Sequence, residues 1–109
     1  MTEIREYVDA RGLSPFGRWF DGLDARAAAR VRTVLARMEA GNLSNLRGVG
    51  GGVLERRIDV GPGYRVYFGR DGDALIVLLG GGTKVRQQRD IEGARVHWEE
   101  YRRRKQQEV

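Results

Sequence analysis

Cysteine is absent from this chain, which excludes a disulfide framework and any zinc site built from thiolates. Long apolar runs are absent too: the longest, Ala74 to Leu79, has the length of a strand rather than of a membrane span. The first residues, MTEIREYVD, are charged from the third position and lack the apolar segment of a signal peptide. We therefore expect a cytoplasmic protein with no membrane partner.

Histidine is nearly absent, with His97 as its only occurrence. It directly precedes Trp98, which faces the core on a predicted helix, and charged residues surround it in the sequence. We interpret His97 as a solvated or interface side chain rather than a catalytic one. The aspartates show no metal-ligand spacing, so we expect no bound metal and no other cofactor.

Basic residues outnumber acidic ones by 20 to 15, which gives a formal net charge of +5 at pH 7. This excess favours an anionic partner, either a nucleic acid or an acidic protein. Part of it lies in the run from Arg102 to Lys105, which is typical of a solvated helix end. The length of 109 residues and the 40% share of hydrophobic residues predict one folded domain with a modest core.

The first half of the chain predicts a short strand and two helices. Weak alternation favours a strand from Glu3 to Asp9. Ser14 followed by Pro15 is a good helix start, and a second helix is predicted from Asp24 to about Ala40. Apolar residues then recur at helical spacing in both segments. They are Phe16, Trp19, Phe20 and Leu23, and then Ala27, Val31, Val34, Leu35 and Met38.

The second half predicts three strands and a final helix. Residues Asn42 to Gly52 are glycine-rich and are predicted to be a loop. Strands are predicted at Val53 to Val60, Tyr64 to Arg70 and Ala74 to Leu79, the last of them apolar on both faces and therefore central. A helix then starts near Thr83, with Ile91, Ala94, Trp98 and Tyr101 as its packing stripe. The order β-α-α-β-β-β-α predicts an α+β domain with a mainly antiparallel sheet.

The predicted hairpin around Gly61-Pro62-Gly63 divides into an apolar and a charged face. A symmetric turn would pair Asp59 with Arg65 and Arg57 with Tyr67, so that the two arginines lie diagonally. One face would then be apolar apart from Arg56. It would carry Leu54, Ile58, Val60, Tyr64, Val66 and Phe68, and the other face Glu55, Arg57, Asp59, Arg65 and Tyr67.

Two interpretations of the charged face remain open on the residues alone. Arg65 with Asp59, and Arg57 with Glu55, could form exposed ion pairs of little energetic value. Alternatively, the two guanidinium groups could grip a phosphate, with Tyr67 stacking on a base. In the second case, loss of Arg65 should abolish the function and spare the fold.

Three longer stretches carry a family resemblance: FGRWFDGLDARAAARVRTVLARMEAGN, VGGGVLERRIDVGPGYRVYF and LLGGGTKVRQQRDIEGA. They cover most of the chain, from Phe16 to Ala94. In them the chain resembles the RelE/ParE superfamily of bacterial toxins, and within it the HigB-like addiction module killer proteins. The resemblance implies a single domain over residues 1–109 with a strongly curved sheet.

The same resemblance implies a function. RelE-like and HigB-like toxins cleave mRNA, usually on the ribosome, and a small antitoxin encoded alongside masks them. We therefore expect a type II toxin that is a metal-independent endoribonuclease and inhibits translation. Its expected partners are a helix-turn-helix antitoxin, mRNA and the ribosome, with operator DNA reached only through the antitoxin. The alternatives are a non-catalytic, ParE-like inhibitor of DNA gyrase, and a degenerate toxin that only binds its antitoxin.

Candidate site residues follow from the matching motifs. Arg57 of LERRID, Arg65 of GPGYRVYF and Lys84 of GGTK are the expected catalytic set, and Arg47, Arg56 and Tyr67 are expected to bind RNA. In metal-free cleavage the 2′-hydroxyl attacks the adjacent phosphate, and preorganised cations stabilise the charge that develops. Arginine is a poor base, so Lys84 is the first candidate for proton transfer and Tyr67 the second. The family often has an acid where this chain has Thr83.

Overall fold

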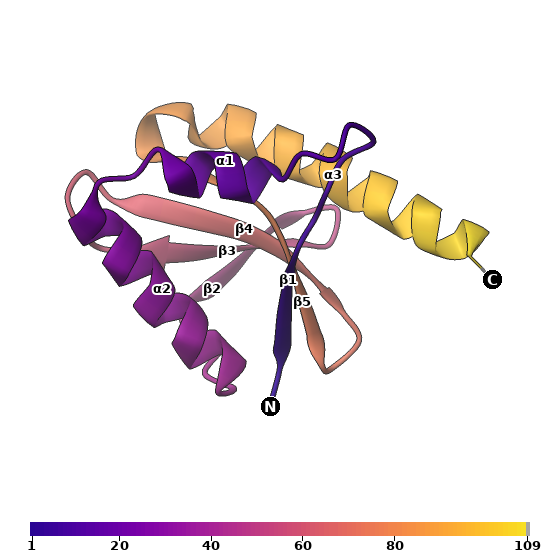
Figure 1. Ribbon diagram of the computed structural model, residues 1–109, viewed down its shortest axis with the longest axis horizontal. Helices are drawn as coiled ribbons and strands as arrows, with labels where there is room; N and C mark the ends of the chain where they lie inside the picture. Colours follow the sequence, from indigo (N-terminus) through magenta and orange to yellow (C-terminus); the bar gives the residue numbers. More distant parts are fainter. Residues whose placement is uncertain (109) are drawn as a thin grey trace.

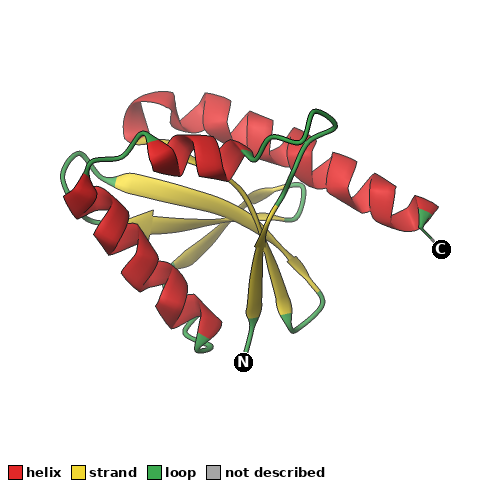
Figure 2. Cartoon of the chain, in the orientation of Figure 1, coloured by secondary structure: helices red, strands yellow, loops and turns green. Residues whose placement is uncertain are grey.

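The computed structural model describes residues 1–108, and in them one five-stranded sheet lies between helices (Figure 1 and Figure 2). The elements, in chain order, are β1 (Glu3–Glu6), α1 (Pro15–Asp21), α2 (Ala25–Glu39), β2 (Leu46–Gly50), β3 (Val53–Ile58), β4 (Tyr64–Asp71), β5 (Leu75–Thr83), a 3₁₀ turn (Lys84–Arg86) and α3 (Gln87–Gln107). The α+β class predicted from the sequence is confirmed. None of the helices in this described part combines the length and apolar character that crossing a membrane requires.

The strand order is β1-β5-β4-β3-β2, with β1 parallel to β5 and the other neighbours antiparallel. The strands turn through a strong twist across the sheet (Figure 1). β5 lies between β1 and β4, so the central position predicted for this strand is confirmed. Its residues Ile76 and Leu78 face one core cluster, whereas Val77 and Leu79 face the other.

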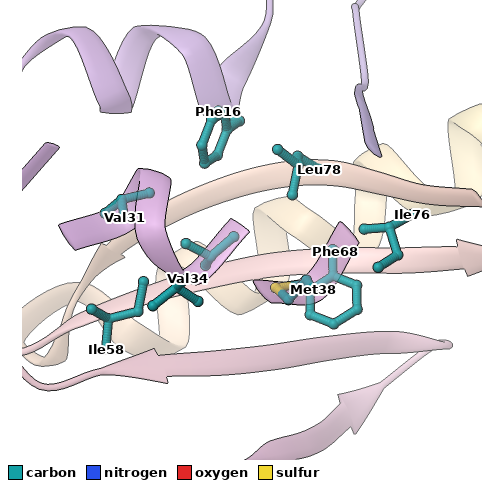
Figure 3. Packing of buried hydrophobic residues seen from close by; sticks show 9 residues of the cluster. Phe16, Val31, Val34, Met38, Ile58, Phe68, Ile76 and Leu78 are labelled. Carbon is teal, nitrogen blue, oxygen red and sulfur yellow. The ribbon is translucent and has the colours of Figure 1, made fainter. Parts of the chain in front are cut away.

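Two hydrophobic clusters, one on each face of the sheet, form the core. The first lies under α1 and α2 (Figure 3) and contains Phe16, Val31, Val34, Met38, Ile58, Val66, Phe68, Ile76 and Leu78. The second lies under α3 and contains Tyr7, Val53, Tyr67, Val77, Leu79, Ile91, Ala94 and Trp98. The helical stripes predicted from spacing pack as expected, and they leave the sheet covered on both sides.

Local signals determine where the first two helices start. The Ser14 hydroxyl accepts a hydrogen bond from Gly17 N at 2.9 Å, and Asp24 Oδ1 accepts one from Ala27 N at 2.8 Å. Both predicted N-caps are therefore confirmed, and each is worth about 1 kcal/mol. The first strand is shorter than predicted because the Asp9 carboxylate accepts the backbone N–H groups of Arg11 and Leu13, which bends the chain.

The predicted loop from Asn42 to Gly52 is wrong in its second half, where β2 pairs antiparallel with β3. The glycines form the tight turn of this hairpin: Gly50, Gly51 and Gly52 have φ values of 95°, 64° and 85°. A Cβ atom at Gly52 would lie 2.8 Å from Trp98 Nε1, so this glycine also makes room for α3. The glycine cluster therefore serves close packing rather than flexibility.

The register predicted for the β3–β4 hairpin is wrong by two residues. Arg57 lies directly opposite Arg65, and Glu55 lies opposite Tyr67. The connection is longer than a symmetric turn at Gly61-Pro62-Gly63 allows, because β3 ends at Ile58 and the two glycines adopt φ values of 54° and 82°. A two-residue shift keeps each side chain on its face, so the predicted division into an apolar and a charged face is confirmed.

β5 continues through three glycines to Thr83 instead of ending at Leu79 as predicted. A Cβ atom at Gly81 would lie 2.3 Å from Trp19 Cε3, and one at Gly82 would lie 2.0 Å from Asp90 Oδ2. These glycines let α1 and α3 approach the strand closely. A run of three glycines is typical of a loop. Here the run lies within β5, because both helices pack closely against the strand at these positions.

Gly81→Ala is expected to lower the free energy of unfolding by about 1–3 kcal/mol, because the added methyl group overpacks the contact with Trp19. Urea unfolding followed by tryptophan fluorescence measures this loss. Gly80→Ala is the matched control, since a Cβ atom there meets nothing within 4 Å. Equal unfolding midpoints for the two variants would contradict this account of Gly81.

Candidate functional site

A polar groove of about 570 Å³ lies on the α3 side of the sheet, beside the start of that helix. We call it the arginine groove. Its principal polar side chains come from four parts of the chain: Arg47 of β2, Glu55 and Arg57 of β3, Arg65 of β4, and Lys84 and Gln87 at the start of the last helix. The three residues expected to be catalytic therefore line one groove, although the sequence separates Lys84 from both arginines.

Glu55 is the acidic centre of the groove and was missed as such in the sequence. Its side chain is only 5% exposed, and Oε2 accepts hydrogen bonds from Gln87 Nε2 at 3.0 Å and from Arg47 Nη2 at 3.4 Å. Arg65 Nε lies 3.8 Å from the same oxygen. One buried carboxylate thus ties β2, β4 and α3 to β3, and the pleat alternation that places it on the charged face was the available signal.

Arg65 combines features of both earlier interpretations. It forms an ion pair, but with Glu55 instead of Asp59, and the pair is buried, with Arg65 at 7% side-chain exposure. Its Nε atom makes no hydrogen bond among the described residues, while the residue still lines the groove. Because removal of one partner leaves a buried charge uncompensated, Arg65 has a structural role that neither the exposed ion pair nor the phosphate-binding interpretation included.

Arg57 is the exposed member of the arginine pair. Its side chain is 66% exposed, and its Nε lies 3.7 Å from Oδ1 of Asp59, which is itself 88% exposed. An ion pair so accessible to water contributes below about 1 kcal/mol to stability. Lys84 is likewise exposed, at the start of the 3₁₀ turn. These two cations can therefore reach a ligand without disturbing the core.

The prediction that Tyr67 stacks on a base is wrong. Its side chain is fully buried beneath α3, and its hydroxyl makes no hydrogen bond within residues 1–108. Burial and the neighbouring Glu55 carboxylate raise the pKa of Tyr67 well above its ordinary value. The phenol is therefore neither a stacking surface nor an accessible proton donor.

Arg56 begins on the face of β3 opposite to Arg57, so its side chain does not lie with the other arginines on the charged face. It reaches the rim of the arginine groove, where Nη1 donates a hydrogen bond to the backbone oxygen of Arg57. Burial and the nearby guanidinium groups of Arg30 and Arg37 lower the pKa of Arg56. The predicted position of Arg56, as the exception on the apolar face, is thus confirmed, and its side chain extends to the rim between the sheet and α2.

Comparison with known proteins gives a family but no activity. No family model matches the chain. Over 82 residues it is 38% identical to a protein of Haemophilus influenzae (strain ATCC 51907 / DSM 11121 / KW20 / Rd), described as an uncharacterized protein. The alignment covers 74% of this chain and 83% of the Haemophilus protein. The chain belongs to the same family as that protein.

The chemistry of the family therefore has to be argued from the groove. Guanidinium, ammonium and amide groups line it, and all of them donate hydrogen bonds to oxyanions. His97 does not line it: the imidazole is half-buried, 4.9 Å from the ring of Tyr7, and burial lowers the pKa of His97. In the described part of the chain, no three histidine, aspartate or glutamate side chains gather in a way that could hold a metal ion. The groove is thus suited to binding phosphate through cations.

Proposed function

We propose that this protein is the toxin of a type II toxin–antitoxin pair, and that it cleaves translated mRNA in the arginine groove, in the cytoplasm. The observation that carries the proposal is the convergence of Arg47, Arg57, Arg65 and Lys84 on one groove whose carboxylates are Glu55 and Asp59. With Arg56 at the rim, five cations against two acids leave an excess of positive charge where a polyanion can enter. The sequence resemblance to RelE-like and HigB-like toxins supplies the reaction.

In the proposed reaction, the 2′-hydroxyl attacks the adjacent phosphate, the bond to the 5′-oxygen breaks, and a cyclic phosphate and a free 5′-hydroxyl result. Negative charge grows on the nonbridging oxygens, and the exposed Arg57 guanidinium can offer them two parallel hydrogen bonds. Arg65, held by Glu55, supplies a fixed positive charge beneath. Lys84 is the candidate for transferring a proton, and the ribosome can orient the substrate.

A non-catalytic inhibitor of DNA gyrase is the second candidate. The burial of Tyr67 favours it, because the groove then presents neither a phenol nor an imidazole for proton transfer. The same cationic groove would in that case contact an acidic surface of the target.

Induced expression in a bacterial host with pulse labelling separates the two candidates. An endoribonuclease should stop amino-acid incorporation within minutes, before thymidine incorporation falls, and an inhibitor of gyrase should reverse that order. The double variant Arg57→Ala/Lys84→Ala, produced at an equal level, is the control for the groove. Early loss of DNA synthesis alone would contradict the nuclease proposal.

The proposed antitoxin is a small helix-turn-helix protein that contacts operator DNA and covers the arginine groove with acidic or apolar residues. The charge complementarity of the groove motivates this expectation. Arg47→Glu/Arg57→Glu should therefore weaken the toxin–antitoxin complex at least ten-fold, measured by calorimetry. If the antitoxin binds the double variant as tightly as it binds the parent protein, it neutralises the toxin from another surface.

A further inference from the structure

α2 carries a stripe of arginines on its outer side. The helix contains four arginines, and its only acid, Glu39, is the last residue. Arg32 has a packing role, because its guanidinium carbon lies 5.1 Å from the centre of the Phe20 ring. The remaining three are exposed and follow one line along the helix, at steps of four and seven residues: Arg26, Arg30 and Arg37. We call these three the α2 stripe.

The α2 stripe runs against the rules that stabilise helices. Arg26 lies in the first turn, where the helix dipole disfavours a cation, and its i,i+4 neighbour is the like-charged Arg30. No carboxylate among the described residues lies within 4 Å of any stripe guanidinium. In α3, by contrast, Arg104 pairs with Glu100 at i,i+4. The α2 stripe therefore does not serve stability.

The α2 stripe is continuous with the arginine groove. A second depression of about 390 Å³ lies between α2 and the connection after β3, and both Arg26 and Arg30 line it. Asp59 borders this depression as well as the arginine groove. Arg56 stands at the rim of the groove on this side. A polyanionic chain that leaves the arginine groove past Asp59 would pass onto the outer side of α2, which lies along this end of the sheet (Figure 1).

The residues between the arginines indicate which polyanion fits. Ala29 and Thr33 lie on the same side of α2, and neither is a large apolar anchor. Protein interfaces depend on buried aromatic and aliphatic residues at their centre, whereas contacts to a nucleic-acid backbone need chiefly cations. Along the helix axis, the helix rise places Arg30 about 6 Å beyond Arg26, and Arg37 about 16 Å beyond Arg26. Such a row of cations can follow successive phosphates of one strand.

We propose that the α2 stripe, together with Arg56, binds the phosphate backbone of the RNA strand outside the segment held in the arginine groove. The inference rests on the proposed function in taking RNA as the ligand, but it does not require that the RNA be cleaved. The α2 stripe supplies affinity and strand direction, and the groove supplies the contacts to the reacting phosphate.

The test measures binding of the purified protein to 2′-O-methyl RNA, which cannot be cleaved through its 2′-hydroxyl groups. Fluorescence anisotropy compares strands of about 4 and about 20 nucleotides between about 50 and 200 mM salt. The variant Arg26→Gln/Arg30→Gln/Arg37→Gln keeps side chains of similar helix propensity. We expect its affinity for the long strand to fall at least ten-fold. The slope of log K against log salt should shrink by about 2, and binding of the short strand should not change.

The matched control is Arg11→Gln/Arg102→Gln/Arg103→Gln, which removes the same charge from three exposed positions elsewhere. Circular dichroism and thermal unfolding verify that both variants are folded. Equal losses in the two variants would show an effect of net charge and overturn the proposal, as would an unchanged salt slope. If the parent protein cleaves no RNA yet shows the dependence on the α2 stripe, the nuclease fails and this inference stands. If the parent cleaves RNA and its binding does not depend on the stripe, the nuclease stands and this inference fails.

Discussion

Arg57→Ala should slow RNA cleavage by about 100-fold or more while the protein remains folded. The expected loss is that of one preorganised donor to the charge that develops on a phosphate oxygen, about 2.7–4 kcal/mol of transition-state stabilisation. The fold should tolerate the change because Arg57 is 66% exposed and its ion pair with Asp59 contributes below about 1 kcal/mol. Arg57→Lys should recover only part of the rate, since an ammonium group cannot make the bidentate contact.

The measurement is cleavage of a reporter mRNA in a translating extract, mapped by primer extension at equal protein concentrations. Asp59→Ala is the matched control: it breaks the same ion pair but removes an acid instead of the cation, so cleavage should persist. If Arg57→Ala cleaves the mRNA at the rate of the parent protein, this guanidinium does not contact the reacting phosphate.

Local sequence signals were sufficient for the elements that depend on neighbouring residues. Ser14 and Asp24 cap their helices with their own side chains, and the apolar stripes follow from helical periodicity. β2 escaped prediction because nothing within Leu46–Gly50 favours a strand by itself. Its existence depends on pairing with β3 and on Trp98 of α3, which lies almost fifty positions further along the chain. Such partners are invisible to a local pattern.

The sequence predicts which residues form the candidate site, but it does not predict how far each side chain is buried. Alternation in β3 and β4 placed Glu55, Arg57, Arg65 and Tyr67 on one face, and the structure has them there. Alternation gives a face but not the extent to which a helix covers it. The start of α3 decides that: Tyr67 and Arg65 of β4 are buried, whereas Arg57, directly opposite Arg65 on β3, is exposed. The roles of these residues follow from this difference in burial.

The burial of Arg65 changes the result that is expected from its substitution. Arg65→Ala should lower the free energy of unfolding by about 3–5 kcal/mol, because it leaves the Glu55 carboxylate buried without its cation. This is a large part of the roughly 5–15 kcal/mol typical of such a domain. Loss of activity in Arg65→Ala would therefore reflect partial unfolding as well as lost chemistry, and Arg57 is the cleaner probe of the reaction.

A double-mutant cycle tests the buried pair directly. Arg65→Met and Glu55→Leu should each be destabilising by a similar amount, since each leaves the other charge buried without its partner, whereas Arg65→Met/Glu55→Leu removes both charges and fills their volume. We expect the double variant to be more stable than either single variant in urea unfolding, with a coupling energy of about 2–3 kcal/mol. Arg47 and Gln87, the other partners of Glu55, are each at least partly exposed and can turn to water.

The exposed pair provides the comparison for this cycle. Arg57→Ala/Asp59→Ala, treated in the same way, should show coupling below about 1 kcal/mol because both side chains remain in water. Additive losses in the Arg65–Glu55 cycle would mean that the two charges, at 3.8 Å, do not interact enough to matter. In that case Arg65 would be free to serve the groove alone, and its burial would need another cause. Strong coupling between Glu55 and Arg65, with weak coupling between Arg57 and Asp59, would instead divide the two arginines as the structure does, one holding the sheet and the other reaching the ligand.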